Sequence, residues 1–229
     1  MYLKSGSFLP LFLFSLHARV RDMKKETSWG NVACWYDELL RSGEGTYQKD
    51  VILPNLLRLM EIKKGEKILD IACGQGFFSR EFVRAGADVT GADIASELIA
   101  IAKKGAPAEV VFHVAPADKM SFAQSESFDK AAIILAIQNI ENLSGTLAES
   151  ARALNQGGKL FIVMNHPVFR NPKHTSWEFN EASKTQYRRV DEYLSESRAE
   201  IEMHPGKEKN SKTVSFHRSL RAVATTVDF

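Results

Sequence analysis

The alternation of apolar and polar positions divides the middle of the chain into short buried strands and helices. An apolar run at 68–71 predicts a strand, and the apolar spacing from 77 to 84 predicts a helix. Similar runs predict further strands at 89–94, 110–114, 131–137 and 159–165, with helices between them. The alternation predicts an α/β fold with a doubly wound, mostly parallel sheet over residues 67–165, whose strand ends converge on one side.

The two ends of the chain have a different pattern. Residues 1–22 carry a nine-residue apolar run that is too short to span a bilayer, so we interpret them as a disordered leader or an over-extended start. Residues 23–66 predict a helical cover, with Pro54 kinking or restarting its second helix. In the last part, 166–229, we expect a polar loop at 171–177, a hairpin that pairs 199–203 with 212–216, and a helix that starts at 219.

Composition indicates an ordinary globular protein. The 229 residues include 44% hydrophobic positions, and 30 basic against 28 acidic side chains leave a net charge of +2. This charge is too small to predict a nucleic-acid or membrane partner. The two cysteines, Cys34 and Cys73, have neither zinc-type nor disulfide-type spacing. We therefore expect no metal site and a reducing, cytoplasmic setting.

The loop after the first strand has the composition of a ligand-binding turn. Small residues at Ala72, Gly74 and Gly76 allow a ligand to approach the backbone, and Asp70 precedes the loop. A carboxylate at a strand end suits a cationic or hydroxylated ligand better than a pyrophosphate. The nicotinamide fingerprint G-x-G-x-x-G requires a glycine where Phe77 stands, which disfavours a nicotinamide oxidoreductase. An ordinary strand–turn–helix connection is the alternative.

A second acid follows at the end of the next predicted strand. Asp93 lies 17 residues after Gly76, close to the place where a βαβ unit positions a carboxylate that binds ribose hydroxyls. The alternative is a charge that satisfies the free N–H groups at the start of the next helix, which we expect Ser96 to cap.

The segment KILDIACGQG resembles the hh[D/E]hGxGxG motif of class I S-adenosylmethionine (SAM)-dependent methyltransferases, with Ala72 in the place of the first glycine. Four further segments are similar to later motifs of this family, in the right order over about 100 residues: VTGADIASELIAIAK, PADKMSF, SFDK with its apolar strand, and LNQGGKLFIV. In the third, Pro116 occupies the place of the usual acid; in the last, Gln156 replaces a proline.

The resemblance implies a Rossmann-like methyltransferase fold, SAM as the methyl donor, and transfer to a small-molecule acceptor by in-line displacement, as in type 11 enzymes. It implies cofactor contacts from Asp70, Ala72, Gly74, Gly76, Asp93, Ile94, Ala117, Asp118, Ala136, Tyr36 and Tyr47. For Asp118 the alternative is a solvated turn residue, and for the two tyrosines it is packing in the core. The resemblance assigns no catalytic residue.

Candidates on the substrate side are Gln138, Asn139, His166 and Tyr187. Gln138 and Asn139 follow the central strand, where open α/β sheets bind ligands, or else they cap the next helix. His166 closes the fifth strand, and a lone histidine is more often neither a base nor a ligand. Tyr187 lies within 166–217, where the family often inserts elements for substrate recognition.

The resemblance also predicts an incomplete sheet. In this family the helix that starts at 219 is followed by two antiparallel strands, and the sequence stops before them. We therefore expect the last antiparallel strands to be lacking and the edge of the fifth strand to need a cover or a partner. This expectation leaves two rival functions, a non-catalytic SAM-binding protein and a truncated, inactive methyltransferase.

Overall fold

The computed structural model describes residues 29–30, 33, 37, 46–202 and 212–227. Several sequence predictions lie outside these residues. They are the leader at 1–22, most of the predicted first helix with Tyr36, and the turn around Gly206.

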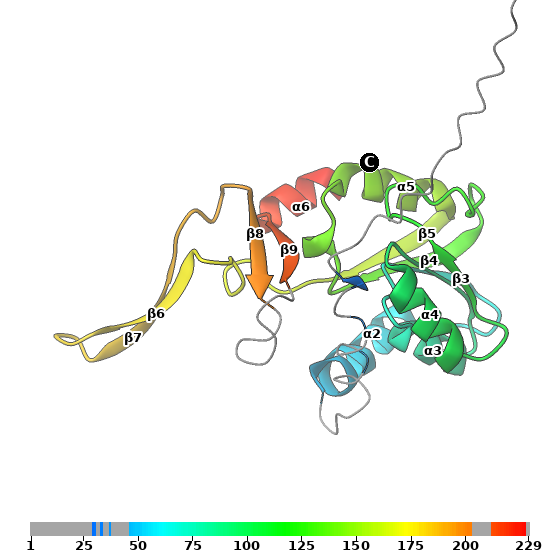
Figure 1. Cartoon of the computed structure of the whole chain (residues 1–229), viewed down its shortest axis with the longest axis horizontal. Coiled ribbons are helices and arrows are strands. Elements are labelled where there is room, and N and C mark those ends of the chain that lie inside the picture. The colour runs from blue at the N-terminus through cyan, green and yellow to red at the C-terminus, as the bar shows by residue number, and fades with distance from the viewer. Residues whose placement is uncertain (1–28, 31–32, 34–36, 38–45, 203–211, 228–229) are drawn as a thin grey trace, which may run out of the picture.

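A five-stranded parallel sheet forms the centre of the molecule (Figure 1). Its strands are β1 (Lys67–Ile71), β2 (Asp88–Asp93), β3 (Val111–Val114), β4 (Phe128–Ile134) and β5 (Leu154–Val163), in the order β3-β2-β1-β4-β5. All four pairings are parallel. The predicted doubly wound parallel sheet is confirmed, and the strand order reverses between β1 and β4, where such sheets bind ligands.

Helices cover both faces of the sheet. They are α2 (Leu53–Met60), α3 (Phe77–Arg84), α4 (Ser96–Gly105), α5 (Leu143–Ala153) and α6 (Leu220–Val227), with a π-helical turn η2 (Gln48–Ile52) and a 3₁₀ turn η3 (Ile137–Asn139). Pro54 lies in the first turn of α2, where its missing N–H costs nothing. None of the described helices is long and apolar enough to cross a membrane.

Two apolar clusters pack against the sheet, one on each side. The first includes Leu56, Phe82 and Ile99 from α2, α3 and α4. The second includes Leu147 of α5 and Val223 of α6. The central strands β1 and β4 serve both clusters, which explains why their sequences are continuous apolar runs rather than alternating ones.

The C-terminal part adds two antiparallel pairs that are separate from the main sheet. Strands β6 (Thr175–Asn180) and β7 (Thr185–Val190) form an arm that projects from the body (Figure 1). Strands β8 (Ser197–Glu202) and β9 (Lys212–His217) form the second pair, so the hairpin predicted there is confirmed. In the described part of the chain, no strand pairs with β5 on the side away from β4.

Three local predictions are wrong. The polar loop expected at 171–177 becomes strand β6 from Thr175 onward, because Thr175, Trp177 and Phe179 alternate with polar positions along an extended chain. Strand β4 ends at Ile134, since Leu135 takes a left-handed φ of 54°. Ser96 does not cap α4; the N-cap is Ala95, whose N–H donates to Asp93.

Candidate functional site

A cavity opens where the strand order reverses, at the carboxyl ends of β1 and β4. The loop after β1 and the start of α3 form one wall, and the segment after β4 forms another. Its volume is about 110 Å³. Its lining includes the predicted residues Asp70, Ala72, Gly74, Ile94, Ala136 and Asn139. The fold therefore brings together parts of three predicted motifs.

The loop after β1 is held in an unusual backbone conformation. Ala72, Gly74 and Gly76 have φ values of 55°, 58° and 77°, in the left-handed region that glycine enters most easily. Backbone hydrogen bonds fix this shape, since Cys73 N–H donates to Ala92 O over 2.9 Å and Gly76 N–H to Cys73 O over 3.0 Å. The loop is thus preformed around the cavity.

Close packing beneath the loop is a further reason for the small residue at Gly76. A Cβ on Gly76 would lie 3.0 Å from Phe112 Cζ and 3.2 Å from Ala102 Cβ, and Gly76 is not among the residues that line the cavity. Gly91 on β2 faces the same ring, because its Cβ would lie 2.7 Å from two Phe112 atoms. Gly76 and Gly91 thus allow close packing beneath the loop.

Two buried carboxylates lie at this end of the sheet: Asp70 lines the cavity, whereas Asp93 does not line it but binds the N–H of Gly74, which does. Asp70 is 2% exposed and accepts a hydrogen bond of 2.5 Å from the Ser79 hydroxyl. Asp93 is 7% exposed and accepts the N–H groups of Gly74 at 2.9 Å and Ala95 at 2.8 Å. Neither forms an ion pair with any described residue.

The electrostatics of this pair favour a cation. Burial, with a further contribution from the nearby Asp93, raises the pKa of Asp70 to about 7. Burial likewise raises the pKa of Asp93. A positive charge or a hydrogen-bond donor close to either carboxylate would stabilise its charged form. The bonds of Asp93 to Gly74 and Ala95 match its alternative role at a helix start, and each oxygen keeps a lone pair for a ligand.

Other predicted cofactor contacts are not at this cavity. The exposed Asp118 accepts a hydrogen bond of 2.8 Å from Asn142, and neither it nor Ala117 lines the cavity. Tyr47 is 59% exposed and also lines no part of it. Tyr36 lies outside the described residues.

Sequence reasoning missed several residues that line the cavity, chiefly Trp29, Gln75 and Phe77. Gln75 is 1% exposed, and its Oε1 accepts a hydrogen bond of 2.8 Å from Arg80. Its Nε2 has no hydrogen-bond partner in the described residues, so it is a buried donor without an acceptor. The sequence signal that could have identified Gln75 is its position as a polar residue between two glycines of the loop.

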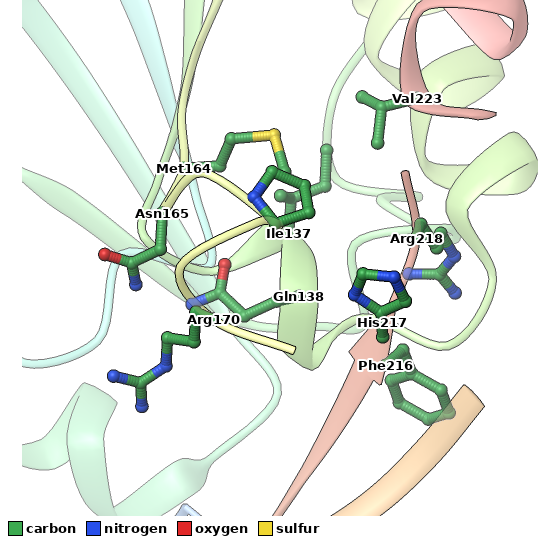
Figure 2. Close-up of a pocket in the computed structure, with 10 residues that line it drawn as sticks. Ile137, Gln138, Met164, Asn165, Arg170, Phe216, His217, Arg218 and Val223 are labelled. Carbon is green, nitrogen blue, oxygen red and sulfur yellow. The ribbon is translucent and has the colours of Figure 1, made fainter. Parts of the chain in front are cut away.

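A second, smaller cavity of about 20 Å³ lies between η3, the end of β5 and β9 (Figure 2). Gln138, Asn165, Arg170, His217 and Arg218 contribute its polar lining. Sequence reasoning identified Gln138 but not His217, which no motif distinguishes.

The remaining candidates on the substrate side occupy other positions. The exposed His166 accepts the Val168 N–H at 3.2 Å through Nδ1. Tyr187 lies on the arm, where its hydroxyl donates to Glu178 over 2.9 Å. Neither Gln138 nor Asn139 caps α5, because Asn142 does so by accepting the Gly145 N–H at 3.0 Å.

Comparison with known proteins shows that the central region is similar to methyltransferases. Residues 69–162 match the family described as methyltransferase domain. The chain is 35% identical over 146 residues to a demethylmenaquinone methyltransferase of Chlorobaculum parvum, covering 62% of this chain and 59% of that enzyme. It is 31% identical over 101 residues to a ubiquinone biosynthesis O-methyltransferase of Xanthomonas oryzae, covering 43% of this chain and 42% of that enzyme. The aligned parts thus span less than two thirds of these relatives.

A solved structure of a SAM-dependent methyltransferase from Mesorhizobium loti aligns with a TM-score of 0.61 and 25% identity, covering 76% of this chain and 77% of that one.

Proposed function

We propose that residues 69–162, which match the methyltransferase domain, form a domain of the class I SAM-dependent type, and that the protein transfers a methyl group from SAM to a small-molecule acceptor. The observation that carries the proposal is a pair of buried carboxylates beside β1: Asp70 lines the cavity, and Asp93 binds the N–H of its lining residue Gly74. SAM carries a sulfonium, an ammonium group and two ribose hydroxyls, which are the cationic and donating groups that buried carboxylates bind.

The residues of the cavity fit such a ligand. Asp70 provides a carboxylate for the positive charge. Asp93, just behind the lining, holds Gly74 in place and keeps lone pairs for hydroxyl groups. Gln75 Nε2 is a buried donor that suits the carboxylate of an amino-acid moiety. Ile94 and Phe77 add apolar surface for a flat ring. When bound, SAM supplies an electrophilic methyl carbon; the protein contributes mainly position.

The acceptor is proposed to be a small hydroxylated or cyclic molecule. The named relatives act in demethylmenaquinone methylation and ubiquinone biosynthesis, which supports a small-molecule acceptor for this chain as well. The net charge of +2 gives no support to nucleic acid. We also propose a cytoplasmic setting, because Cys73 is a free thiol in the cavity wall and is best kept reduced.

Calorimetric titration of S-adenosylhomocysteine, the demethylated product, tests the proposal. We expect micromolar affinity for the wild-type chain, at least a tenfold loss in Asp93→Ala, and no change in Asp88→Asn. Asp88 begins the same strand but is exposed, so it is the matched control. A folded wild-type protein that does not bind, or an Asp93→Ala variant that binds as well, would contradict the proposal.

The rival functions predict other results. A nicotinamide enzyme would bind NAD more tightly than S-adenosylhomocysteine. A non-catalytic binding protein, or an inactive methyltransferase, would bind S-adenosylhomocysteine and transfer no methyl group to any acceptor.

A further inference from the structure

Two buried hydrogen-bond acceptors in the second cavity have no partner. Gln138 Oε1 and His217 Nδ1 are both enclosed and make no hydrogen bond within the described part of the chain. His217 is 4% exposed. Both residues line the cavity shown in Figure 2. Native structures rarely leave buried polar atoms unpaired, so the arrangement indicates an occupant.

Each side chain uses its other polar atom in a hydrogen bond to the backbone, and that bond determines whether the unpaired atom is a donor or an acceptor. Gln138 Nε2 lies 2.5 Å from Leu135 O, and only the amide nitrogen can donate to a carbonyl oxygen. His217 Nε2 lies 2.9 Å from Tyr193 O, so this nitrogen carries the proton and Nδ1 of the neutral ring is an acceptor. The cavity therefore offers two acceptors, and its occupant has to be a donor.

Two charged side chains restrict the chemistry of that donor. Arg170 and Arg218 line the same cavity, and Arg218 is fixed there because its Nη atoms donate to Ile140 O and Glu141 O at 3.0 and 2.6 Å. Their positive charge disfavours an ammonium group. It favours an oxygen on which negative charge develops. A thiol is a weak donor, so a hydroxyl group fits best.

The cavity is next to the proposed cofactor site. The segment 136–139 lines both cavities: Ala136 and Asn139 line the first, whereas Ile137 and Gln138 line the second. Its volume of about 20 Å³ admits one small polar group, not a whole acceptor molecule.

We propose, resting on the methyltransferase function above, that this cavity receives the reacting hydroxyl of a hydroxylated acceptor and that His217 is its proton acceptor. The hydroxyl oxygen forms a bond to the methyl carbon of the sulfonium as the carbon–sulfur bond breaks. The electron pair of the broken carbon–sulfur bond stays on sulfur. The hydroxyl proton passes to His217 Nδ1, while Nε2–H remains bound to Tyr193 O. The products are a methyl ether, S-adenosylhomocysteine and one released proton. The assignment makes the enzyme an O-methyltransferase.

Nuclear magnetic resonance of the protein saturated with S-adenosylhomocysteine tests the binding step. Catechol is the probe, and 1,2-dimethoxybenzene, which has the same ring without a donor, is its control. We expect catechol to shift the ¹⁵N resonance of His217 Nδ1, and the dimethoxy compound to leave it unchanged. Equal shifts from both compounds, or none from catechol, would overturn the assignment.

Methyl transfer from labelled SAM to catechol tests the chemical step. We expect His217→Phe to lower kcat about 100-fold with an unchanged KM for SAM, the effect typical of losing a general base. Gln138→Met should raise the KM for catechol. His174→Phe is the matched control, because His174 lines no part of the cavity. Wild-type rates in His217→Phe, or transfer to aniline or thiophenol in place of catechol, would overturn the proposal.

The outcomes separate this proposal from the one on which it rests. If S-adenosylhomocysteine does not bind to the folded protein, the methyltransferase function itself fails. If it binds normally but catechol is neither bound nor methylated, only the hydroxyl assignment fails.

Discussion

At the scale of single residues, Asp70 is the group whose charge should control both stability and binding. Its folded pKa of about 7 lies above the ordinary value of 3.8, so between these values the folded protein holds a proton that the unfolded chain has lost. The resulting stability is fully present below pH 3.8 and is lost as the pH rises through 7.

We therefore predict that the unfolding temperature of the ligand-free protein falls by several degrees between pH 5 and pH 8. The Asp70→Asn variant should show a much smaller fall, because asparagine carries no charge to bury and can still accept the Ser79 hydroxyl. Thermal unfolding followed by circular dichroism measures both. Asp88→Asn serves as the control, and a pH dependence that survives in Asp70→Asn would contradict the prediction.

The protonation of Asp70 also predicts how the affinity for SAM depends on pH. A cationic ligand favours the charged form of Asp70, so SAM should bind more tightly as the pH rises from 6 to 8 and should displace a proton near pH 7. Calorimetry in two buffers of different ionisation enthalpy counts the released protons. We expect no such release near neutral pH in Asp70→Asn.

Gly91 gives a prediction about packing. Because a Cβ there would lie 2.7 Å from the Phe112 ring, Gly91→Ala should lower the free energy of unfolding by about 1–3 kcal/mol, measured by urea denaturation. Adding Phe112→Leu should recover part of the loss, since a smaller side chain makes room. If Gly91→Ala is as stable as the wild type, the close contact does not constrain this position.

At the scale of elements, the local sequence pattern is sufficient to predict the parallel core, but it does not predict the second cavity. Strands β1 and β4 are predictable because burial on both faces leaves a continuous apolar run. The end of β4 was placed too late, since a single left-handed residue, Leu135, turns the chain without any glycine to mark it. His217 was missed because its role depends on Gln138, which is distant in sequence and meets it only in the fold.

The β6–β7 arm is an element whose stability should be local. A lone two-stranded hairpin is marginal in water, and the Arg188 guanidinium lies 5.3 Å from the centre of the Trp177 ring and 5.8 Å from that of Phe169. We predict that Arg188→Ala accelerates amide exchange in β6 and β7 while changing the free energy of global unfolding by less than about 1 kcal/mol.

Arg189→Ala is the matched control for the arm. Arg189 is an exposed neighbour that makes only ion pairs, with Glu178 and Asp191, and such pairs contribute little. In the Arg189→Ala variant, amide exchange in β6 and β7 should stay close to that of the wild type. Equal exchange in Arg188→Ala and the wild type would show that the two ring contacts do not hold the arm.

At the scale of the whole molecule, one sheet joins the two apolar clusters, so the body should unfold as a single unit. The loops of the cavity beside β1 are anchored to β1 and β4, and residues of these two strands belong to both clusters. A ligand bound there stabilises the folded state as a whole, by about 2.7 kcal/mol at a concentration 100 times its Kd.

We thus predict that S-adenosylhomocysteine slows amide exchange to a similar extent in α3 and in α5, on opposite faces of the sheet, and leaves β6 and β7 unchanged. Hydrogen exchange measured by mass spectrometry tests this, with Asp93→Ala as the control that should show clearly weaker protection at the same ligand concentration. Protection restricted to α3 would mean that the faces unfold separately. Protection that reaches the arm would mean that ligand binding couples to β6 and β7, a connection that the antiparallel pairs, separate from the main sheet, do not provide.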